Sequence, residues 1–267
     1  MILASASPTG LGLGFAAIGV YALSAAGVRW LGERAARSLF GLALVLHGAG
    51  LAWGVASDQP HFGFAPALSV TAWLVALVYA GESLLLPLPH MRWPLSAMGM
   101  TAVGLALLFA GTPLHASASS WLPVHWALGI ASYGLFGAAV AHGWFLNHTE
   151  DRIRKGLPSY GGVPLLTLER LTFRLVGAGF LVLTAALALG FLFRSQVFGT
   201  QAAFRWDHKT AFSALSWLTF AWLLLGRVRF GWRGKRAVRL LYLGAGLLLL
   251  AYAGSRFVLE IILQRPA

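Results

Sequence analysis

The sequence predicts an all-α integral membrane protein with about eight transmembrane helices. Of its 267 residues, 58% are hydrophobic and only 10% are charged, and the mean hydropathy is +0.73. A soluble domain of this composition would have to expose much of its apolar surface to water. Apolar runs long enough to cross a hydrocarbon core of ~30 Å recur along the chain. Because lipid offers the backbone no hydrogen-bond partners, runs of this length predict helices.

The apolar runs define the expected spans and the domain organisation. They lie near residues 9–29, 38–56, 66–86, 94–111, 122–147, 170–193, 209–226 and 237–260. The connections between them are short, so we expect no inserted soluble domain and a single transmembrane domain over residues 1–267. No basic segment of the kind found in a cleaved signal peptide precedes the first run, so we expect that run to be a retained span.

The basic residues predict the orientation. If both termini lie outside, fifteen of the twenty Lys and Arg residues fall in inner loops or at their edges, and five fall outside. Cytoplasmic loops of membrane proteins are enriched in Lys and Arg, so both termini are predicted to be periplasmic in a bacterial inner membrane. The same rule explains the net charge of +12 without a nucleic-acid partner. Membrane lipid is the expected surrounding.

Histidines are the candidate metal ligands, because the sequence contains no Cys. That excludes disulfides, thiolate metal sites and a Cys-x-x-Cys-His haem attachment. His125 opens the fifth predicted span and His208 opens the seventh, at the same predicted outer surface. Two imidazoles at equal depth on different helices can bind one iron from opposite faces, so we predict a haem b with His125 and His208 as its metal ligands. The alternative is that both are ordinary interfacial residues at helix ends.

Aromatic and acidic neighbours support this pair. Trp126 follows His125, and Trp206 precedes His208 by two residues, so both indoles can form walls of a haem site. Asp207 can orient the His208 imidazole as a hydrogen-bond acceptor, or it can pair with a neighbouring cation instead.

His47 is a different kind of candidate. It lies about nine residues into the second span, roughly 14 Å deep at ~1.5 Å per residue. A histidine at this depth is costly and usually functional, so His47 is a candidate for a second haem-binding site or for the route by which haem reaches the outer pair. The alternative is a neutral imidazole that is hydrogen-bonded to a neighbouring helix.

Three passages carry a resemblance to a known family. Residues 124–136 are similar to a family helix that begins with His and contains Ser-Tyr. Residues 206–217 are similar to the end of its tryptophan-rich segment and the following helix, and residues 231–239 with 250–257 are similar to its C-terminal hairpin. The chain thus resembles the cytochrome c assembly, or haem-handling, family of integral membrane proteins related to CcsA and CcmC. Within that family it looks most like the YpjD/HemX-like inner-membrane branch.

The resemblance implies haem handling at the outer face of a bacterial inner membrane. It places His125 on the first external haem ligand of the larger relatives and likens His47 to their first transmembrane histidine. The departures are also informative. Of the long tryptophan-rich segment only Trp206-Asp207 remains, the second external histidine is absent near Ser255, and His208 stands where the motif has proline. The ligand role of His208 therefore rests on the predicted geometry alone.

These observations together predict a haem-binding carrier or assembly factor without catalytic turnover of its own. It would act in cytochrome c maturation or haem handling at the periplasmic face, with haem and other cytochrome c biogenesis or haem-biosynthesis proteins as partners. Two alternatives stay open. A regulator or scaffold of haem-biosynthetic or other membrane enzymes would use the basic inner loops. A haem transporter would need polar residues through the membrane, and beyond His47 and Glu82 the spans offer few.

Overall fold

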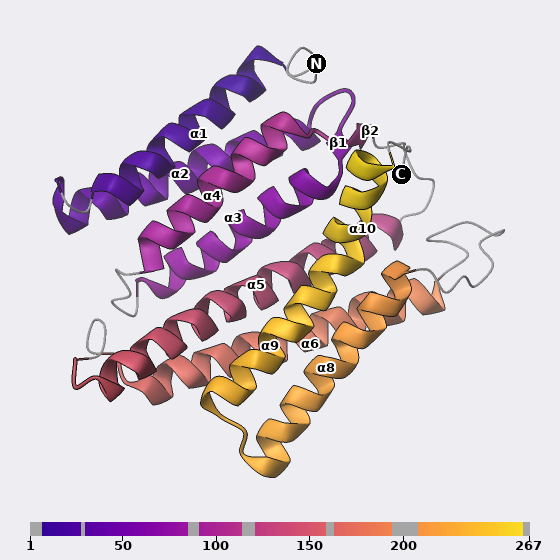
Figure 1. The fold of residues 1–267 in the computed structure, drawn as a ribbon. Coiled ribbons are helices and arrows are strands. Elements are labelled where there is room, and N and C mark those ends of the chain that lie inside the picture. The colour runs from indigo at the N-terminus through magenta and orange to yellow at the C-terminus, as the bar shows by residue number, and fades with distance from the viewer. Residues whose placement is uncertain are drawn as a thin grey trace. The chain divides into compact units, whose positions relative to one another are not determined.

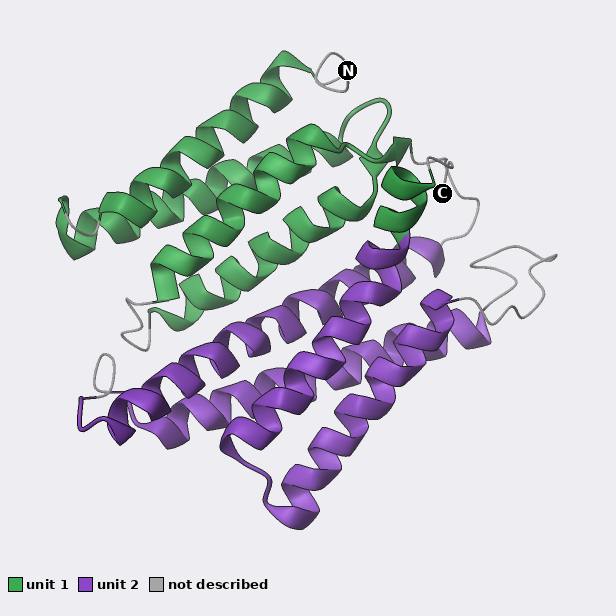
Figure 2. Cartoon of the chain, viewed as in Figure 1, with its two compact units in different colours: residues 1–114, 256–267 green, residues 115–255 purple. Residues whose placement is uncertain are grey.

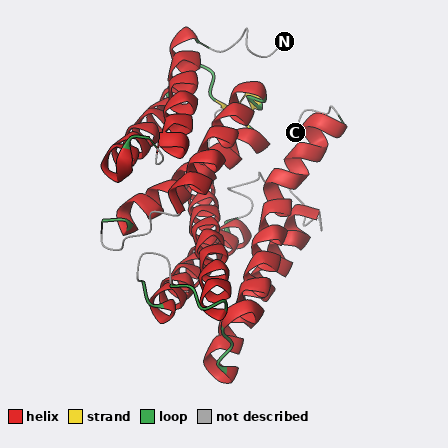
Figure 3. Ribbon diagram, turned by 60° about the vertical axis from the view of Figure 1, so that its left-hand side comes forward, coloured by secondary structure: helices red, strands yellow, loops and turns green. Residues whose placement is uncertain are grey.

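The computed structural model shows a helical protein whose helices follow the predicted spans. It describes residues 7–27, 30–84, 91–113, 121–158, 163–193 and 208–263. Nearly all of these residues are helical (Figure 3). The helices are α1 (Pro8–Gly27), α2 (Gly32–Val55), α3 (Phe64–Glu82), α4 (Arg92–Leu108), α5 (Trp121–Arg154), α6 (Leu165–Leu192), α8 (His208–Phe230) and α9 (Gly234–Leu249) (Figure 1).

After α9 the helix continues, but its hydrogen-bonding pattern changes from α-helical to partly π-helical. It continues through a π-helical segment, Leu250–Gly254, a short turn α10 (Ser255–Phe257) and a second π-helical segment, Val258–Ile262. Seven of the described helices, counting this continuation with α9, are long and apolar enough to cross a membrane. The eighth, α4, has 17 residues. The all-α, polytopic prediction is therefore confirmed.

Two helix ends differ from the predicted spans. α5 continues to Arg154 rather than ending near residue 147, since its polar last turns are supported by an ion pair between Glu150 and Arg154 one turn apart. α6 begins at Leu165, directly after Pro164, and not near residue 170. Hydropathy finds only the part of a helix that lies in lipid, so it misses helical turns that extend beyond it.

The chain divides into two compact units (Figure 2). Unit 1 comprises residues 1–114 and 256–267, and unit 2 comprises residues 115–255. The prediction of a single domain over residues 1–267 concerns the chain as a whole and stays a prediction.

Unit 1 contains α1 to α4 and has a core of small and aromatic side chains. Small residues let apolar helices approach closely. Its fully buried alanines are Ala17, Ala36, Ala43, Ala65 and Ala76. A two-stranded sheet, β1 (His61–Phe62) against β2 (Thr112–Pro113), joins its loops in antiparallel register.

Unit 2 is a bundle of α5, α6, α8 and α9. Its centre is a stack of Phe136 on Phe220, with ring centroids 3.7 Å apart and an interplanar angle of 4°. In the turn between α8 and α9, Gly231 adopts φ 62°, and Trp232 folds back onto Gly226, where a side chain of any size would collide with the indole. This tight turn fixes α9 against α8.

Candidate functional site

His125 and His208 lie at the same end of the unit 2 bundle. α5 and α8 both begin at this end, and α6 runs antiparallel to them (Figure 1). His125 contacts Ala186 near the end of α6. His208 is the first residue of α8 and is exposed. The structure thus brings the two predicted ligands to one end, while their joint ligation of iron stays a prediction.

A backbone acceptor on α6 contacts the His125 ring. Its Nδ1 lies 3.0 Å from the carbonyl oxygen of Ala186. A carbonyl oxygen can only accept a hydrogen bond, so this contact requires Nδ1 to carry the proton. In the neutral imidazole Nε2 then carries the lone pair, which is the form that coordinates a metal.

Two glycines leave room around this ring. A Cβ built on Gly190 of α6 would lie 3.0 Å from His125 Cε1, which is closer than most side-chain contacts, so the glycine helps the ring to pack tightly against α6. On α5 itself, a Cβ built on Gly129, one turn beyond His125, would have no atom within 4 Å. The surface of α5 at Gly129 therefore borders open space.

Contacts between the helices connect this end of unit 2 to the interior of the bundle. Ser132 of α5 is fully buried, and the Phe136–Phe220 stack closes the interior below it. Tyr133 donates a hydrogen bond to the carbonyl oxygen of Leu248, just before the first π-helical segment. That segment presents Tyr252, whose ring lies 5.5 Å from the Lys209 ammonium.

This end of the bundle is open, whereas its middle is closed. In the described part of α5, no residue before Ser132 is buried, and in α8 none before Ser216 is buried. Trp121 stacks on Phe193 at 4.3 Å, which ties the start of α5 to the end of α6. Trp126 is 37% exposed and lies at the rim. Trp206 and Asp207 lie outside the described residues, so their predicted roles stay predictions.

His47 occupies a closed position in unit 1. It is 3% exposed, and both of its ring nitrogens have partners. Nδ1 lies 3.2 Å from the hydroxyl of Tyr21, and Nε2 lies 2.9 Å from the hydroxyl of Ser69. In this arrangement His47 is a hydrogen-bonding bridge between α1, α2 and α3. A cofactor-binding role would require one of these two partners to move aside.

The described residues offer haem ligands more readily than ligands for a free ion. Within them, no three His, Cys, Asp or Glu side chains gather closely enough to hold a metal ion. A haem needs only one or two axial ligands from the protein, because the macrocycle supplies the rest. His125 and His208 at the open end of unit 2 could supply these one or two axial ligands.

Several residues of this site were missed by the sequence reasoning. Ala186, Gly190 and Tyr252 come from helices whose apolar runs show no polar signal at these positions. Lys209 was one of the neighbouring cations with which Asp207 could pair, and Tyr133 entered only as part of the Ser-Tyr pair in the family resemblance. The face below His125, with Gly129, Ser132 and Phe136, was predicted from helical spacing, and the same spacing would have placed Tyr133 there, since it follows His125 by eight residues.

Comparisons with known proteins found a matching family model and several relatives. The family model described as "Cytochrome C assembly protein" matches residues 35–263. An uncharacterized 28.8 kDa protein of Azospirillum brasilense is 32% identical over 235 residues, which cover 83% of this chain and 85% of that protein. A cytochrome c biogenesis protein CcsA of Synechococcus is 34% identical over 107 residues, or 38% of this chain and 30% of that protein.

The inner membrane protein YpjD of Escherichia coli is also similar. It is 29% identical over 150 residues, which cover 55% of this chain and 56% of YpjD. The chain thus matches less than two thirds of the length of either CcsA or YpjD. No solved structure matches. The apolar helices and these similarities identify a multi-pass protein of the bacterial inner membrane.

Proposed function

Because the chain belongs to the cytochrome c assembly protein family, we propose that it binds haem b at the open end of unit 2 and acts as an assembly factor in cytochrome c maturation. His125 would hold the iron through Nε2, and His208 would supply the second axial nitrogen. The orientation that puts this end at the periplasmic face, with both termini periplasmic, is part of the proposal.

The single observation that carries the proposal is the state of the His125 ring. The bond to the Ala186 carbonyl fixes the proton on Nδ1 and turns Nε2 into the lone-pair nitrogen. Open space at Gly129 lies one turn away on the same helix. A carbonyl that orients a ligating imidazole from behind is a common support of metal-binding histidines.

The remaining residues supply binding and orientation. Haem, when bound, would supply the redox-active iron, and the protein would hold and present it. The Lys209 ammonium, at the rim beside Tyr252, is placed to pair with a haem propionate. The stacked Phe136 and Phe220 below provide an apolar floor that keeps water out.

The other partners follow from the family. Relatives named as cytochrome c biogenesis proteins support haem and further biogenesis proteins as partners of this chain. A separate enzymatic activity is not part of the proposal.

An optical spectrum of the purified protein tests the proposal. Bis-histidine haem should give a low-spin Soret band and split α and β bands after anaerobic reduction, either as isolated or after addition of haem. His125→Ala should lose the haem, and His208→Ala should lose it or convert it to a high-spin form. A wild-type protein that shows no such spectrum after reconstitution would contradict haem binding.

Two histidine controls make this test specific. His148 is an exposed histidine at the opposite end of α5, and His142 is buried in the same helix. His148→Ala and His142→Ala should both keep the low-spin spectrum per folded protein. Equal loss of haem in all four variants would mean that haem binds without specific ligation.

A further inference from the structure

The opposite end of unit 2 contains an open, charged hollow that the proposed haem site does not use. It lies between the end of α5 and the starts of α6 and α9, and its volume is about 400 Å³. Its charged walls are Glu150 and Arg154 of α5, Glu169 of α6, and Arg233 and Lys235 at the start of α9. Binding sites for small molecules are typically of about this size.

Glu169 lies at the inner wall of this hollow and is shared by two arginines. Its carboxylate is 8% exposed and forms an ion pair with Arg227. Arg233 Nε lies 3.6 Å from the same carboxylate, which is too far for a good hydrogen bond. The Arg233 side chain is 63% exposed. Arg233 is therefore held near the hollow but only loosely paired within it.

The ion pairs around the hollow leave an excess of positive charge. Four cations face three carboxylates: Arg154 with Glu150, Lys235 with Asp151, and Arg227 and Arg233 with Glu169. The pairs of Arg154 and Lys235 are partly or largely exposed, so a ligand can compete for these cations.

Two helix starts add to this excess. α6 begins at Leu165 and α9 begins at Gly234, and both residues line the hollow. Neither helix has an acidic residue in its first turn or a side chain that caps its first amides. Each start carries about half a positive charge. The two helix starts and the one cation in excess over the carboxylates together make the hollow suited to an anion of one to two charges.

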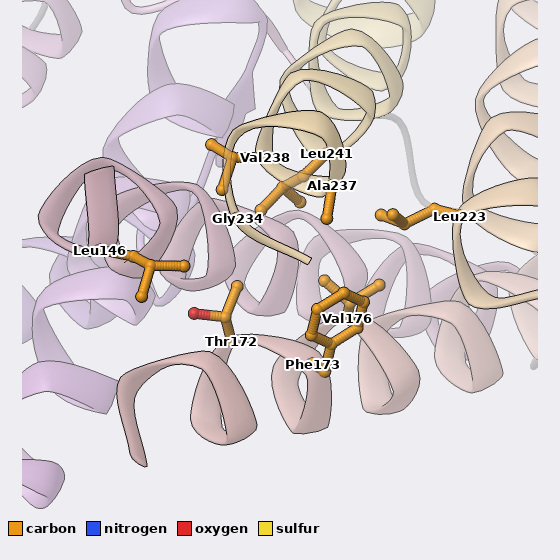
Figure 4. A pocket seen from close by; sticks show the side chains of 9 residues that line it. All are labelled: Leu146, Thr172, Phe173, Val176, Leu223, Gly234, Ala237, Val238 and Leu241. Atoms are coloured by element: carbon orange, nitrogen blue, oxygen red, sulfur yellow. The ribbon is translucent and has the colours of Figure 1, made fainter. Parts of the chain in front are cut away.

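The space beneath the hollow limits how deep a ligand can reach. Figure 4 shows the apolar side chains that close the bundle there, among them Val176, Ala237 and Leu241. The gap that they enclose has a volume of about 10 Å³ and shares Leu146 and Gly234 with the hollow. A gap of this size holds at most a single water. The ligand must therefore stay at the level of the charged residues.

The outward side of the hollow is apolar. Leu165 lines it, and the next residue, Leu166, is 63% exposed on a helix that is long and apolar enough to cross the membrane. A ligand whose anionic part fills the hollow can thus place an apolar part against these two leucines. An amphiphile can use both the charged hollow and the apolar leucines beside it, whereas a free anion uses only the charged hollow.

We propose that this hollow binds the headgroup of an anionic phospholipid. Arg154, Arg233 and Lys235 contact the phosphate, and the acyl chains lie against Leu165 and Leu166. Basic sites between helix ends at a membrane surface are suited to such headgroups. The site is separate from His125 and His208, so the proposal stands or falls independently of haem binding.

Native mass spectrometry of the full-length protein in detergent, titrated with phosphatidylglycerol or phosphatidylcholine, tests this proposal. The wild type should bind phosphatidylglycerol more tightly than phosphatidylcholine. The double variant Arg233→Gln/Lys235→Gln should weaken phosphatidylglycerol binding by about fivefold for each cation removed. The matched control Arg34→Gln/Arg37→Gln removes two exposed arginines from unit 1 and should leave this binding unchanged.

A second variant distinguishes loss of lipid binding from loss of folding. Glu150→Gln removes a carboxylate that competes for Arg154, so it should strengthen phosphatidylglycerol binding. A misfolded protein would not gain affinity. Equal weakening in both double variants, weaker binding by Glu150→Gln, or equal affinity for phosphatidylcholine would overturn the proposal. Glycerol 3-phosphate binding as tightly as phosphatidylglycerol would overturn the lipid assignment in favour of a free phosphate ligand.

Discussion

His47 of unit 1 and His125 of unit 2 are both imidazoles on long apolar helices, yet their surroundings differ in kind. His47 is bonded at both nitrogens, to Tyr21 and to Ser69, and is almost fully buried. His125 is bonded at Nδ1 to a carbonyl and lies in the part of the bundle where no residue of α5 is buried. The first ring connects three helices of unit 1, and the second lies at the end of the unit 2 bundle where the helix starts are not buried.

This difference shows what depth in the membrane does and does not indicate. A buried imidazole must satisfy its nitrogens, and neighbouring hydroxyls can do so completely. A ligand-binding imidazole needs one nitrogen fixed and the other directed to open space. Histidines of these two kinds are distinguished by their partners on other helices and not by their position along one helix.

The largest effect should come from removing the closed histidine. His47→Leu leaves the hydroxyls of Tyr21 and Ser69 buried without their partner, so it should lower the free energy of unfolding by about 3 kcal/mol. His125→Leu loses one bond at the open end of a bundle and should lower it by less than about 1 kcal/mol. Unfolding in mixed micelles with increasing denaturing detergent measures both values.

The same pair of variants should have the opposite order in haem binding. The folded fraction of His47→Leu should retain haem, while His125→Leu should lose it. If His47→Leu instead keeps its stability and loses haem, the ring is a ligand and its bonds to Tyr21 and Ser69 are replaceable.

A smaller stability effect is expected at the glycine beside His47. A Cβ on Gly48 would lie 2.9 Å from the Trp73 ring, and the Trp73 indole N–H donates to the carbonyl of Leu44 at 2.9 Å. Because that bond holds the ring in place, Gly48→Ala should destabilise the protein by about 2 kcal/mol. Gly50→Ala is the matched control on the same helix, since its Cβ would meet only an ordinary contact at 3.8 Å. Equal midpoints for the two variants would show that the helices of unit 1 are loosely packed.

Much of the fold could be predicted from the sequence, because lipid restricts the backbone to helices. Hydropathy located the eight long helices of the described residues, including α4, but it missed the last turns of α5 beyond residue 147. The π-helical segments after α9 were also missed, since their residues are as apolar as those of the preceding helix. Winding depends on local backbone bonds and on packing, and hydropathy is insensitive to both.

The candidate site was predictable only in outline. The shared end of His125 and His208 followed from counting spans. The partners that decide each histidine's role lie far away in sequence: Ala186 is 61 residues from His125, and Ser69 is 22 residues from His47. A single sequence contains no signal for such pairs, so the two interpretations of His47 could not be separated before its contacts were known.

The open space at Gly129 of α5 leads to a further prediction. Gly129→Leu places a side chain where the structure has no atom within 4 Å, so the protein should remain folded, with haem affinity lowered about tenfold by filling the ligand's space. Gly177→Leu is the matched control, because this glycine of α6 also borders open space. Titration of haem into the apoprotein, followed at the Soret band, measures both. Equal haem affinities in Gly129→Leu and the wild type would place the ligand elsewhere.

The smallest effect is expected at the rim. Lys209→Gln removes the ammonium proposed to pair with a propionate and should weaken haem binding about fivefold, or roughly 1 kcal/mol. Lys155→Gln removes an exposed lysine beyond the other end of α5 and should change nothing. Haem dimethyl ester has no free propionates, so it should bind the wild type and Lys209→Gln equally well. If Lys209→Gln weakens binding of haem and its ester alike, then Lys209 acts by packing on Tyr252 and positioning α8, and the open end of unit 2 recognises the macrocycle without its carboxylates.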